Sequence, residues 1–192
     1  MFIKHHTKGV VVSSKIEGDS NKRVNLFTKN FGLISAKVQG ARNVHSKLRS
    51  GSQDFCLGEF SLVHGKTGWR VVSVRADKNL FEEFRNSPNK LKIVCNILNL
   101  VRKLISEEEA HTPVFNIIYN FFIFLEKAKE QDIALAECLT LVRILHSLGY
   151  MRHDPELSIP ISSSEIDIKD LEMIAPRRFQ IISLINESLK TT

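Results

Sequence analysis

The sequence has few of the residues that mark disulfide-bonded, collagen-like or membrane-spanning proteins. Its three cysteines, Cys56, Cys95 and Cys138, form no Cys-x-x-Cys pair, which excludes a zinc ribbon and a thioredoxin-like redox motif. Nine glycines and five prolines in 192 residues are too few for a collagen-like or low-complexity chain. The longest apolar run, Phe121 to Leu125, is far shorter than the ~20 residues of a membrane span. We therefore expect a cytoplasmic protein with reduced thiols and no membrane association.

Motifs that carry catalytic chemistry are also missing. No Gly-x-Gly-x-x-Gly or Gly-x-Ser-x-Gly sequence occurs, and Gly65-Lys66-Thr67 lacks the earlier glycine of a Walker A loop. The seven histidines are scattered without a carboxylate at ligand spacing, and the run Glu107-Glu108-Glu109 does not readily converge on one ion. We expect neither an enzyme nor a bound metal ion or other cofactor, and we interpret the acidic run as a solvated loop.

Positive charge is abundant, and it is concentrated in one part of the chain. The whole chain carries 27 Lys and Arg against 21 Asp and Glu, a net charge of +6. Residues 1–80 carry 14 basic against 5 acidic side chains, or +9, whereas residues 81–192 carry 13 against 16, or −3. A segment with this charge attracts a polyanion in a salt-dependent way. The alternative is a solvated basic face without a specific partner.

The hydrophobic pattern changes at the same place as the charge. Before residue 80, short β-branched runs separated by turn residues predict five strands, at residues 9–16, 23–28, 33–39, 55–63 and 69–74. Five short strands in so small a segment favour a small barrel or sandwich. The OB-fold is the five-stranded barrel that typically binds oligonucleotides.

Beyond residue 80, apolar residues recur every three or four positions, which predicts helices. Ser87-Pro88 and Thr112-Pro113 are typical helix starts, and Gly149 suits the position just after a third helix. A last helical region, 166–189, is expected to break at Pro176. The sequence thus predicts an α+β protein, with an OB-fold barrel at 1–78 and an all-helical domain at 79–192. Residues 151–165 are expected to form a linker or loop.

The basic residues between the third and fourth predicted strands point to a polyanion-binding surface. Residues 39–52 are small and polar, with three basic side chains and no acid before Asp54. Such a loop can follow a phosphate backbone, and basic residues on the neighbouring strands extend the surface. Trp69, Phe55, Phe27 and Phe31 are candidates for stacking on bases. For each of them the alternative, a place in the core, is favoured, because a small barrel needs its aromatic side chains inside. The predicted nucleic-acid-binding residues are Arg42, Lys47, Arg49, Lys37, Arg70 and Arg75.

Several short motifs, taken in order, resemble the RecO family of bacterial recombination mediators. The motifs are Gly9-Val10-Val11-Val12-Ser13-Ser14, Leu26-Phe27-Thr28, Phe31-Gly32, Gly40-Ala41-Arg42 and Leu148-Gly149-Tyr150. The resemblance implies an OB-fold before a helical domain, binding to single- and double-stranded DNA, and annealing of complementary strands. It implies help in loading a recombinase onto single-stranded DNA, at the nucleoid. It also implies two protein partners, RecR and the acidic C-terminal tail of single-strand-binding protein.

The sequence departs from the family pattern at several points. Arg42 matches the arginine of the family's Lys-Gly-Ala-Arg motif, but Gln39 stands where the family has lysine. Many members carry a four-cysteine zinc module after Leu-Gly-Tyr, whereas residues 151–157 contain no cysteine, so zinc is predicted to be absent. The chain is also shorter than typical members by several tens of residues, which suggests a trimmed or divergent form.

The helical half is expected to bind the acidic, apolar-ended tail in a groove with basic rims. Arg102, Lys103 and Arg143 lie on or beside apolar stripes and are the candidates, the alternative being ordinary solvated helix charge. Two other functions stay open: an OB-fold RNA-binding protein, and a protein-only adaptor whose basic face meets an acidic partner. Only RNA offers a 2′-hydroxyl, and an adaptor predicts no oligonucleotide binding at physiological salt.

Overall fold

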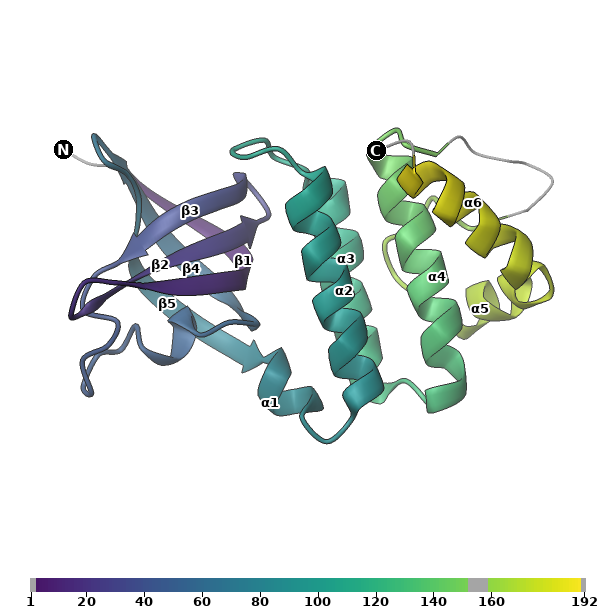
Figure 1. Cartoon of the computed structure of the whole chain (residues 1–192), viewed down its shortest axis with the longest axis horizontal. Helices are drawn as coiled ribbons and strands as arrows, with labels where there is room; N and C mark the ends of the chain where they lie inside the picture. Colours follow the sequence, from purple (N-terminus) through teal and green to yellow (C-terminus); the bar gives the residue numbers. More distant parts are fainter. Residues whose placement is uncertain (1–2, 152–158, 191–192) are drawn as a thin grey trace. The chain divides into compact units, whose positions relative to one another are not determined.

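The computed structural model describes residues 3–151 and 159–190 and confirms an α+β fold (Figure 1). The chain divides into two compact units, Met1–Thr112 and Pro113–Thr192. The first unit contains all five strands together with the first two helices, and the second contains the later helices. The functional boundary after residue 78 stays a prediction, because two helices group with the strands in this division.

Five strands close into a barrel in the first unit. They are β1 (Lys4–Glu17), β2 (Asn21–Thr28), β3 (Gly32–Val38), β4 (Cys56–Gly65) and β5 (Gly68–Asn79). Their order around the barrel is β1-β2-β3-β5-β4, and only β3 and β5 pair in parallel. This closed five-stranded arrangement, in which β1 pairs with both β2 and β4, is an OB-fold and confirms the predicted fold class.

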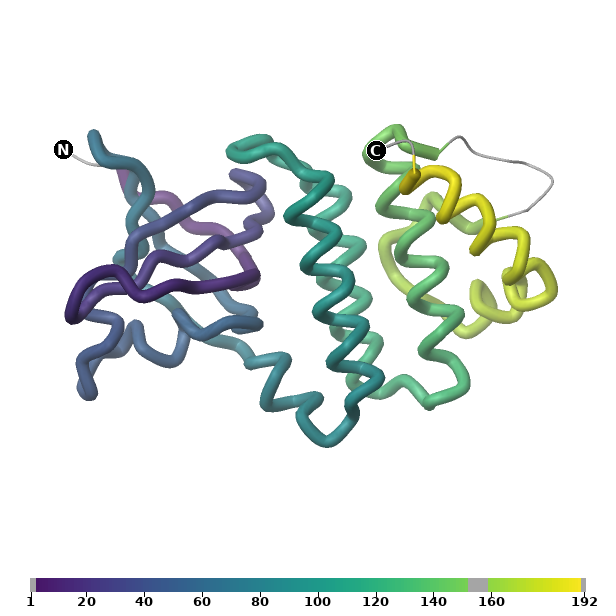
Figure 2. Tube along the Cα trace, in the orientation of Figure 1, coloured from purple at the N-terminus to yellow at the C-terminus, as the bar shows by residue number. Residues whose placement is uncertain are grey.

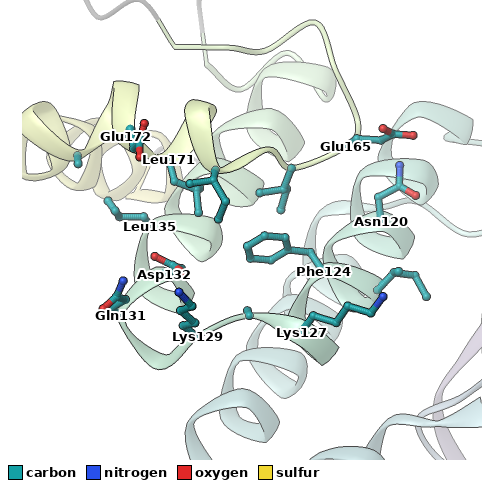
Figure 3. Close-up of a pocket in the computed structure, with 15 residues that line it drawn as sticks. Asn120, Phe124, Lys127, Lys129, Gln131, Asp132, Leu135, Glu165, Leu171 and Glu172 are labelled. Carbon is teal, nitrogen blue, oxygen red and sulfur yellow. The ribbon is translucent and has the colours of Figure 1, made fainter.

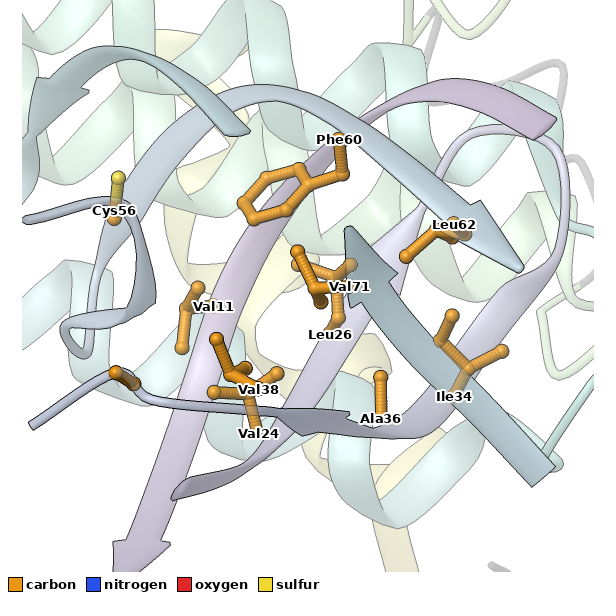
Figure 4. Packing of buried hydrophobic residues seen from close by; sticks show 11 residues of the cluster. Val11, Val24, Leu26, Ile34, Ala36, Val38, Cys56, Phe60, Leu62 and Val71 are labelled. Carbon is orange, nitrogen blue, oxygen red and sulfur yellow. The ribbon is translucent and has the colours of Figure 1, made fainter. Parts of the chain in front are cut away.

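The barrel core consists of side chains that alternate along the strands and point inward (Figure 4). They are Val11, Val24, Leu26, Ile34, Ala36, Val38, Cys56, Phe60, Leu62 and Val71. Ala41 joins this cluster from the loop after β3, and Leu48 packs against it. Successive side chains of a strand point to opposite faces. Arg23, next to Val24 in β2, and Lys37, between Ala36 and Val38 in β3, therefore lie on the outside of the barrel.

Two helices complete the first unit, α1 (Leu80–Phe84) and α2 (Pro88–Leu104). Asn79 caps α1, because its side chain accepts hydrogen bonds from the backbone of Phe81 and Glu82. The second helix begins at Pro88, directly after Ser87, as the sequence predicts.

The second unit is helical, with α3 (Thr112–Lys127), α4 (Glu130–Ser147), α5 (Ile168–Ile174) and α6 (Arg178–Lys190). Gly149 has a φ of 78° just after α4, which confirms its predicted position. The predicted break at Pro176 is confirmed, since a 3-10 turn at Ala175–Arg177 separates α5 from α6. Residues 152–158 of the predicted linker lie outside the described residues. Among the helices that are described, none is long and apolar enough to cross a membrane.

Candidate nucleic-acid interface

Four basic side chains lie side by side on the outer face of the barrel. The strand register pairs Lys15 with Arg23, Arg23 with Lys37, and Lys37 with Arg70. These residues therefore form one line across β1, β2, β3 and β5, which we call the basic row. Lys15 and Arg70 are exposed, and the other two are partly exposed. Neighbouring strands lie about 4.8 Å apart, so the row places four cations within roughly 15 Å.

One acid lies beside the basic row. Arg23 Nη2 donates to Glu17 Oε1 at 2.8 Å, and this hydrogen bond lowers the pKa of Glu17 below its usual value. The charges of Lys37 and Lys15 lower the pKa of Glu17 further, so both lysines lie close to it. Within the part of the chain that the structure describes, Lys15, Lys37 and Arg70 make no ion pair. The row keeps an excess of positive charge that is available to an anion.

A line of small polar side chains runs next to the basic row. Ser13 pairs with Asn25, and Asn25 pairs with Ser35, in the same three strands. The Asn25 side chain donates to Ser13 Oγ at 3.0 Å, and all three residues are partly exposed. Hydroxyl and amide groups bind phosphate and sugar oxygens, so this line extends a surface suited to a nucleic-acid backbone.

The predicted basic loop is a series of turns that is anchored at both ends (Figure 2). At its start, Arg42 Nη1 donates to the carbonyl oxygens of Gly18 and Asp19, at 3.4 and 2.8 Å. At its end Gly51 is buried, and a Cβ there would lie 2.3 Å from a methyl carbon of Val74. Arg42 is thereby held at the β1–β2 turn, at the end of the hairpin that carries the first half of the basic row.

The other two basic residues of the loop are available to solvent. Lys47 and Arg49 are exposed, and Arg49 directly precedes the short 3-10 turn Ser50–Ser52. Leu48 between them packs against the barrel core. This partly buried residue holds the backbone against the barrel, so the flanking cations project from a constrained segment.

Arg75 does not join the basic row. Its Nη2 atom lies 2.9 Å from Glu59 Oε2, and its Nη1 atom lies 3.4 Å from Asp77 Oδ1. The hydrogen bond to Glu59 and the two negative charges raise the pKa of Arg75. Because two carboxylates flank this guanidinium, it offers a phosphate little net positive charge. The structure therefore places Arg75 in a surface ion-pair network.

The candidate aromatic residues separate into two groups. Phe27 is fully buried, so it has no face for a base. Phe31 and Trp69 are partly buried, with ring centroids 4.9 Å apart. Phe55 is also partly buried and has a φ of 66°. Sequence reasoning did not identify that His5 and His64 contact Trp69, because these rings come from different strands.

Arg143 lies in the interior of the second unit and not on the expected rim of a groove. It is 1% exposed, and it donates to the carbonyl oxygens of Pro160 and Glu165 at 2.8 and 2.7 Å. It also donates to Asp170 Oδ2 at 2.8 Å. Burial lowers the pKa of Arg143, and the ion pair with Asp170 opposes that shift. All three nitrogen atoms of the side chain are used within the chain, which leaves little for a partner.

The two other predicted partner-binding residues are exposed. Arg102 and Lys103 lie in the last turn of α2, where positive charge suits the helix dipole. They belong to the first unit, whereas Arg143 belongs to the second.

An apolar pocket of about 860 Å³ opens on the second unit (Figure 3). Phe124 on α3, Leu135 on α4 and Leu171 on α5 form its walls, and Lys127 and Lys129 lie near the α3–α4 connection. Three carboxylates also line it: Asp132, Glu165 and Glu172. The sequence did not reveal this pocket, because its walls come from segments about forty residues apart in the chain. The hydrogen bonds of Arg143 to Glu165 and Asp170 hold the later segment against α4.

No set of three or more His, Cys, Asp and Glu side chains is arranged to hold a metal ion among residues 3–151 and 159–190. The chemistry that the described surface supports is recognition of an anion by fixed cations.

Comparisons with known proteins agree with this fold. Residues 1–74 match the family model described as Recombination protein O N terminal. The chain is 28% identical over 144 residues to "DNA repair protein RecO" of Acetivibrio thermocellus, covering 75% of the chain and 57% of that protein. It is 27% identical over 165 residues to the protein of that name from Alkaliphilus metalliredigens, covering 86% of the chain and 64% of the relative.

A third relative, "DNA repair protein RecO" of Halalkalibacterium halodurans, is 25% identical over 164 residues, covering 85% of the chain and 62% of that protein. The chain thus spans about 57 to 64% of the length of these three curated relatives. Residues 1–74, which hold most of the OB-fold barrel, are therefore similar to the family described as Recombination protein O N terminal, and the chain as a whole is similar to the DNA repair proteins RecO.

Proposed function

We propose that this chain binds DNA through the outer face of its barrel and acts in DNA repair and recombination. The basic row carries this proposal, because strand register holds its four cations in one line on an OB-fold surface. The name of its relatives, DNA repair protein, supports the same role. The protein acts by binding rather than by catalysis.

The expected contacts go to the phosphate backbone and carry no base sequence information. Single- and double-stranded DNA both offer such a backbone, so the chain binds both. When cations lie between two strands they screen the repulsion between the backbones, and complementary strands then anneal more readily. We also propose that the chain anneals complementary strands and helps to load a recombinase onto single-stranded DNA, and that it does so at the nucleoid.

We propose that the second unit binds the acidic C-terminal tail of single-strand-binding protein in its apolar pocket. An apolar terminal side chain enters between Phe124, Leu135 and Leu171, and the acidic part of the tail lies beside Lys127 and Lys129. This site replaces Arg143, which is buried, and it does not require Arg102 or Lys103. RecR is a proposed partner on the family resemblance, without an assigned surface.

DNA binding is tested by fluorescence anisotropy with labelled single- and double-stranded DNA over a range of salt concentrations. Lys37→Ala removes one cation of the basic row, and we expect the salt slope to fall by about 1. Lys15→Ala with Lys37→Ala should lower the slope by about 2. The control is Lys92→Ala, an exposed lysine on α2 in the same unit. Equal losses in Lys37→Ala and Lys92→Ala would mean that net charge alone drives binding.

The same assay separates the other two functions. A clear preference for RNA over DNA of equal length would favour an RNA-binding protein, because only RNA carries the 2′-hydroxyl. Absence of oligonucleotide binding even at low salt would favour a protein adaptor that uses the basic face for an acidic partner.

A further inference from the structure

Four rings, which are separate from the residues of the basic row, lie together at one end of the barrel. Trp69 lies at the centre of this ring cluster, with its ring centroid 4.9 Å from Phe31, 4.8 Å from His64 and 5.8 Å from His5. His64 is exposed, and the other three residues are partly buried. The cluster therefore packs against the barrel core on one side and retains accessible ring surface on the other.

Two cations lie next to members of the ring cluster along the chain: Lys66 comes two residues after His64, and Arg70 directly follows Trp69. The β4–β5 turn follows His64 and precedes Trp69, and a depression of about 320 Å³ lies against it, lined in part by Lys66 and Arg70. Arg70 is also the last member of the basic row. A nucleic-acid backbone that follows the row ends at Arg70, the residue directly after Trp69 in β5. Aromatic rings beside cations are the arrangement that binds the bases and phosphates of a single strand.

An acidic segment of the same unit is docked on this end of the barrel. Trp69 Nε1 donates to Glu108 Oε1 at 3.1 Å, and the backbone N–H of Glu108 donates to the Leu33 carbonyl oxygen at 3.0 Å. The Glu109 carbonyl lies so close to Gly32 that a Cβ on Gly32 would be 1.9 Å from its oxygen. Glu108 has a φ of 60°, a left-handed conformation that side-chain-bearing residues keep only where their surroundings impose it.

We propose that the ring cluster is a base-stacking subsite for single-stranded nucleic acid and that Glu108 is its intramolecular competitor. The proposal rests on the proposed function and adds strand selectivity to it. While the segment is docked, Glu107, Glu108 and Glu109 repel a phosphate at this end. When the bond between Trp69 and Glu108 opens, a base stacks on the indole and its phosphate lies by Lys66 and Arg70. A duplex has no unstacked base to offer, so only single strands gain affinity.

Stacking is tested through the indole itself, because Trp69 is the single tryptophan of the chain. Titration of the full chain with oligothymidylate should quench its fluorescence, and a hairpin duplex should quench it much less. Trp69→Leu should weaken binding of oligothymidylate by roughly tenfold and leave duplex binding unchanged, since one stacked base contributes about that much. His64→Ala, which removes the exposed ring beside the indole, should have the same selectivity. Equal losses for both DNA forms in His64→Ala would overturn the subsite.

The competitor is tested by comparing two substitutions that remove one negative charge each. Glu108→Ala removes both the charge and the hydrogen bond to Trp69, whereas the matched control Glu107→Ala removes a neighbouring charge and leaves that bond. We expect Glu108→Ala to raise single-strand affinity about fivefold more than Glu107→Ala does. A fivefold change in affinity is the lower end of the usual coupling between two competing or cooperating sites. Equal gains would show that the segment acts by charge alone, which overturns the competitor role.

The salt slope of Lys37→Ala and the fluorescence of Trp69 report on two different parts of the barrel, the basic row and the ring cluster. If Lys37→Ala lowers the salt slope but oligothymidylate leaves the fluorescence of Trp69 unchanged, the basic row binds DNA and the stacking subsite is wrong. If the unmodified chain binds neither form of DNA at low salt, the proposed function is wrong and the subsite with it.

Discussion

At the scale of single residues, the sequence identifies cations well but not their neighbours across strands. Lys37 and Arg70 were predicted to share a surface, and the register pairs them directly. Arg23 was missed, because its place in the row depends on strand pairing that no local pattern reveals. Arg75 was predicted to bind nucleic acid, although Glu59 pairs with it in the structure. Glu59 lies sixteen positions away in the chain, so no local pattern reveals that ion pair. Net charge was therefore predictable, and its local compensation was not.

Arg143 gives a stability prediction at this scale. Arg143→Met leaves the Asp170 carboxylate and two carbonyl oxygens without their donor, so we expect the free energy of unfolding to fall by about 3 kcal/mol. Urea denaturation followed by circular dichroism measures this change. The control is Arg102→Met on the exposed surface of α2, which should change stability by less than about 0.5 kcal/mol. Similar small effects in both variants would contradict the structural role of Arg143.

Glu17 gives a prediction about pH and DNA affinity. Its pKa is lowered in the folded state, so its pairing stabilises the fold above the ordinary value of 4.5 and is lost as the pH falls through the lowered pKa. Glu17→Gln should therefore reduce the stability difference between pH 7 and pH 3. It should also raise DNA affinity, because it frees Arg23 and removes a negative charge beside the basic row. Denaturation at both pH values and DNA anisotropy measure the two effects. A variant with unchanged DNA affinity would argue against the row as the interface.

At the scale of elements, the cores of the strands were predictable and their ends were not. β1 begins at Lys4 rather than residue 9, because its first residues pair with β4 although they form no apolar run. β5 continues to Asn79 beyond the predicted end at residue 74, through residues that pair with β4. Helix ends were predicted more closely, since Pro88, Gly149 and Pro176 act through local backbone geometry.

The docked acidic segment gives a prediction at this scale. Gly32→Ala places a methyl group where the Glu109 carbonyl lies, so we expect the segment to leave the barrel and single-strand affinity to rise. The matched control is Gly18→Ala, because Gly18 has a similar φ of 68° and no atom within 4 Å of an added Cβ. Both variants incur the left-handed backbone cost, about 1 kcal/mol. Only Gly32→Ala should increase proteolytic cleavage at residues 106–110. Equal cleavage of both variants would contradict the docking contact.

At the scale of the whole molecule, the first unit carries the excess positive charge and the second carries the apolar pocket. The excess of positive charge lies in the first 80 residues, which form the barrel, and the structure turns part of it into one aligned row. The second unit contributes an apolar pocket instead. In the sequence, charge and hydrophobic periodicity both change near residue 80, whereas the two compact units divide after Thr112. The sequence did not predict the pocket, since that depends on how residues 165–172 return to α3 and α4.

The division predicts that the two binding activities can be removed independently. Lys127→Glu with Lys129→Glu should abolish binding of an acidic peptide with an apolar C-terminal residue and leave duplex DNA affinity within about twofold, since neither lysine belongs to the barrel. Lys15→Ala with Lys37→Ala should have the opposite effect. Anisotropy with labelled peptide and labelled DNA measures both in the same samples. If the peptide instead competes with DNA for the unmodified chain, it binds the basic row, because one cationic surface then serves both anions.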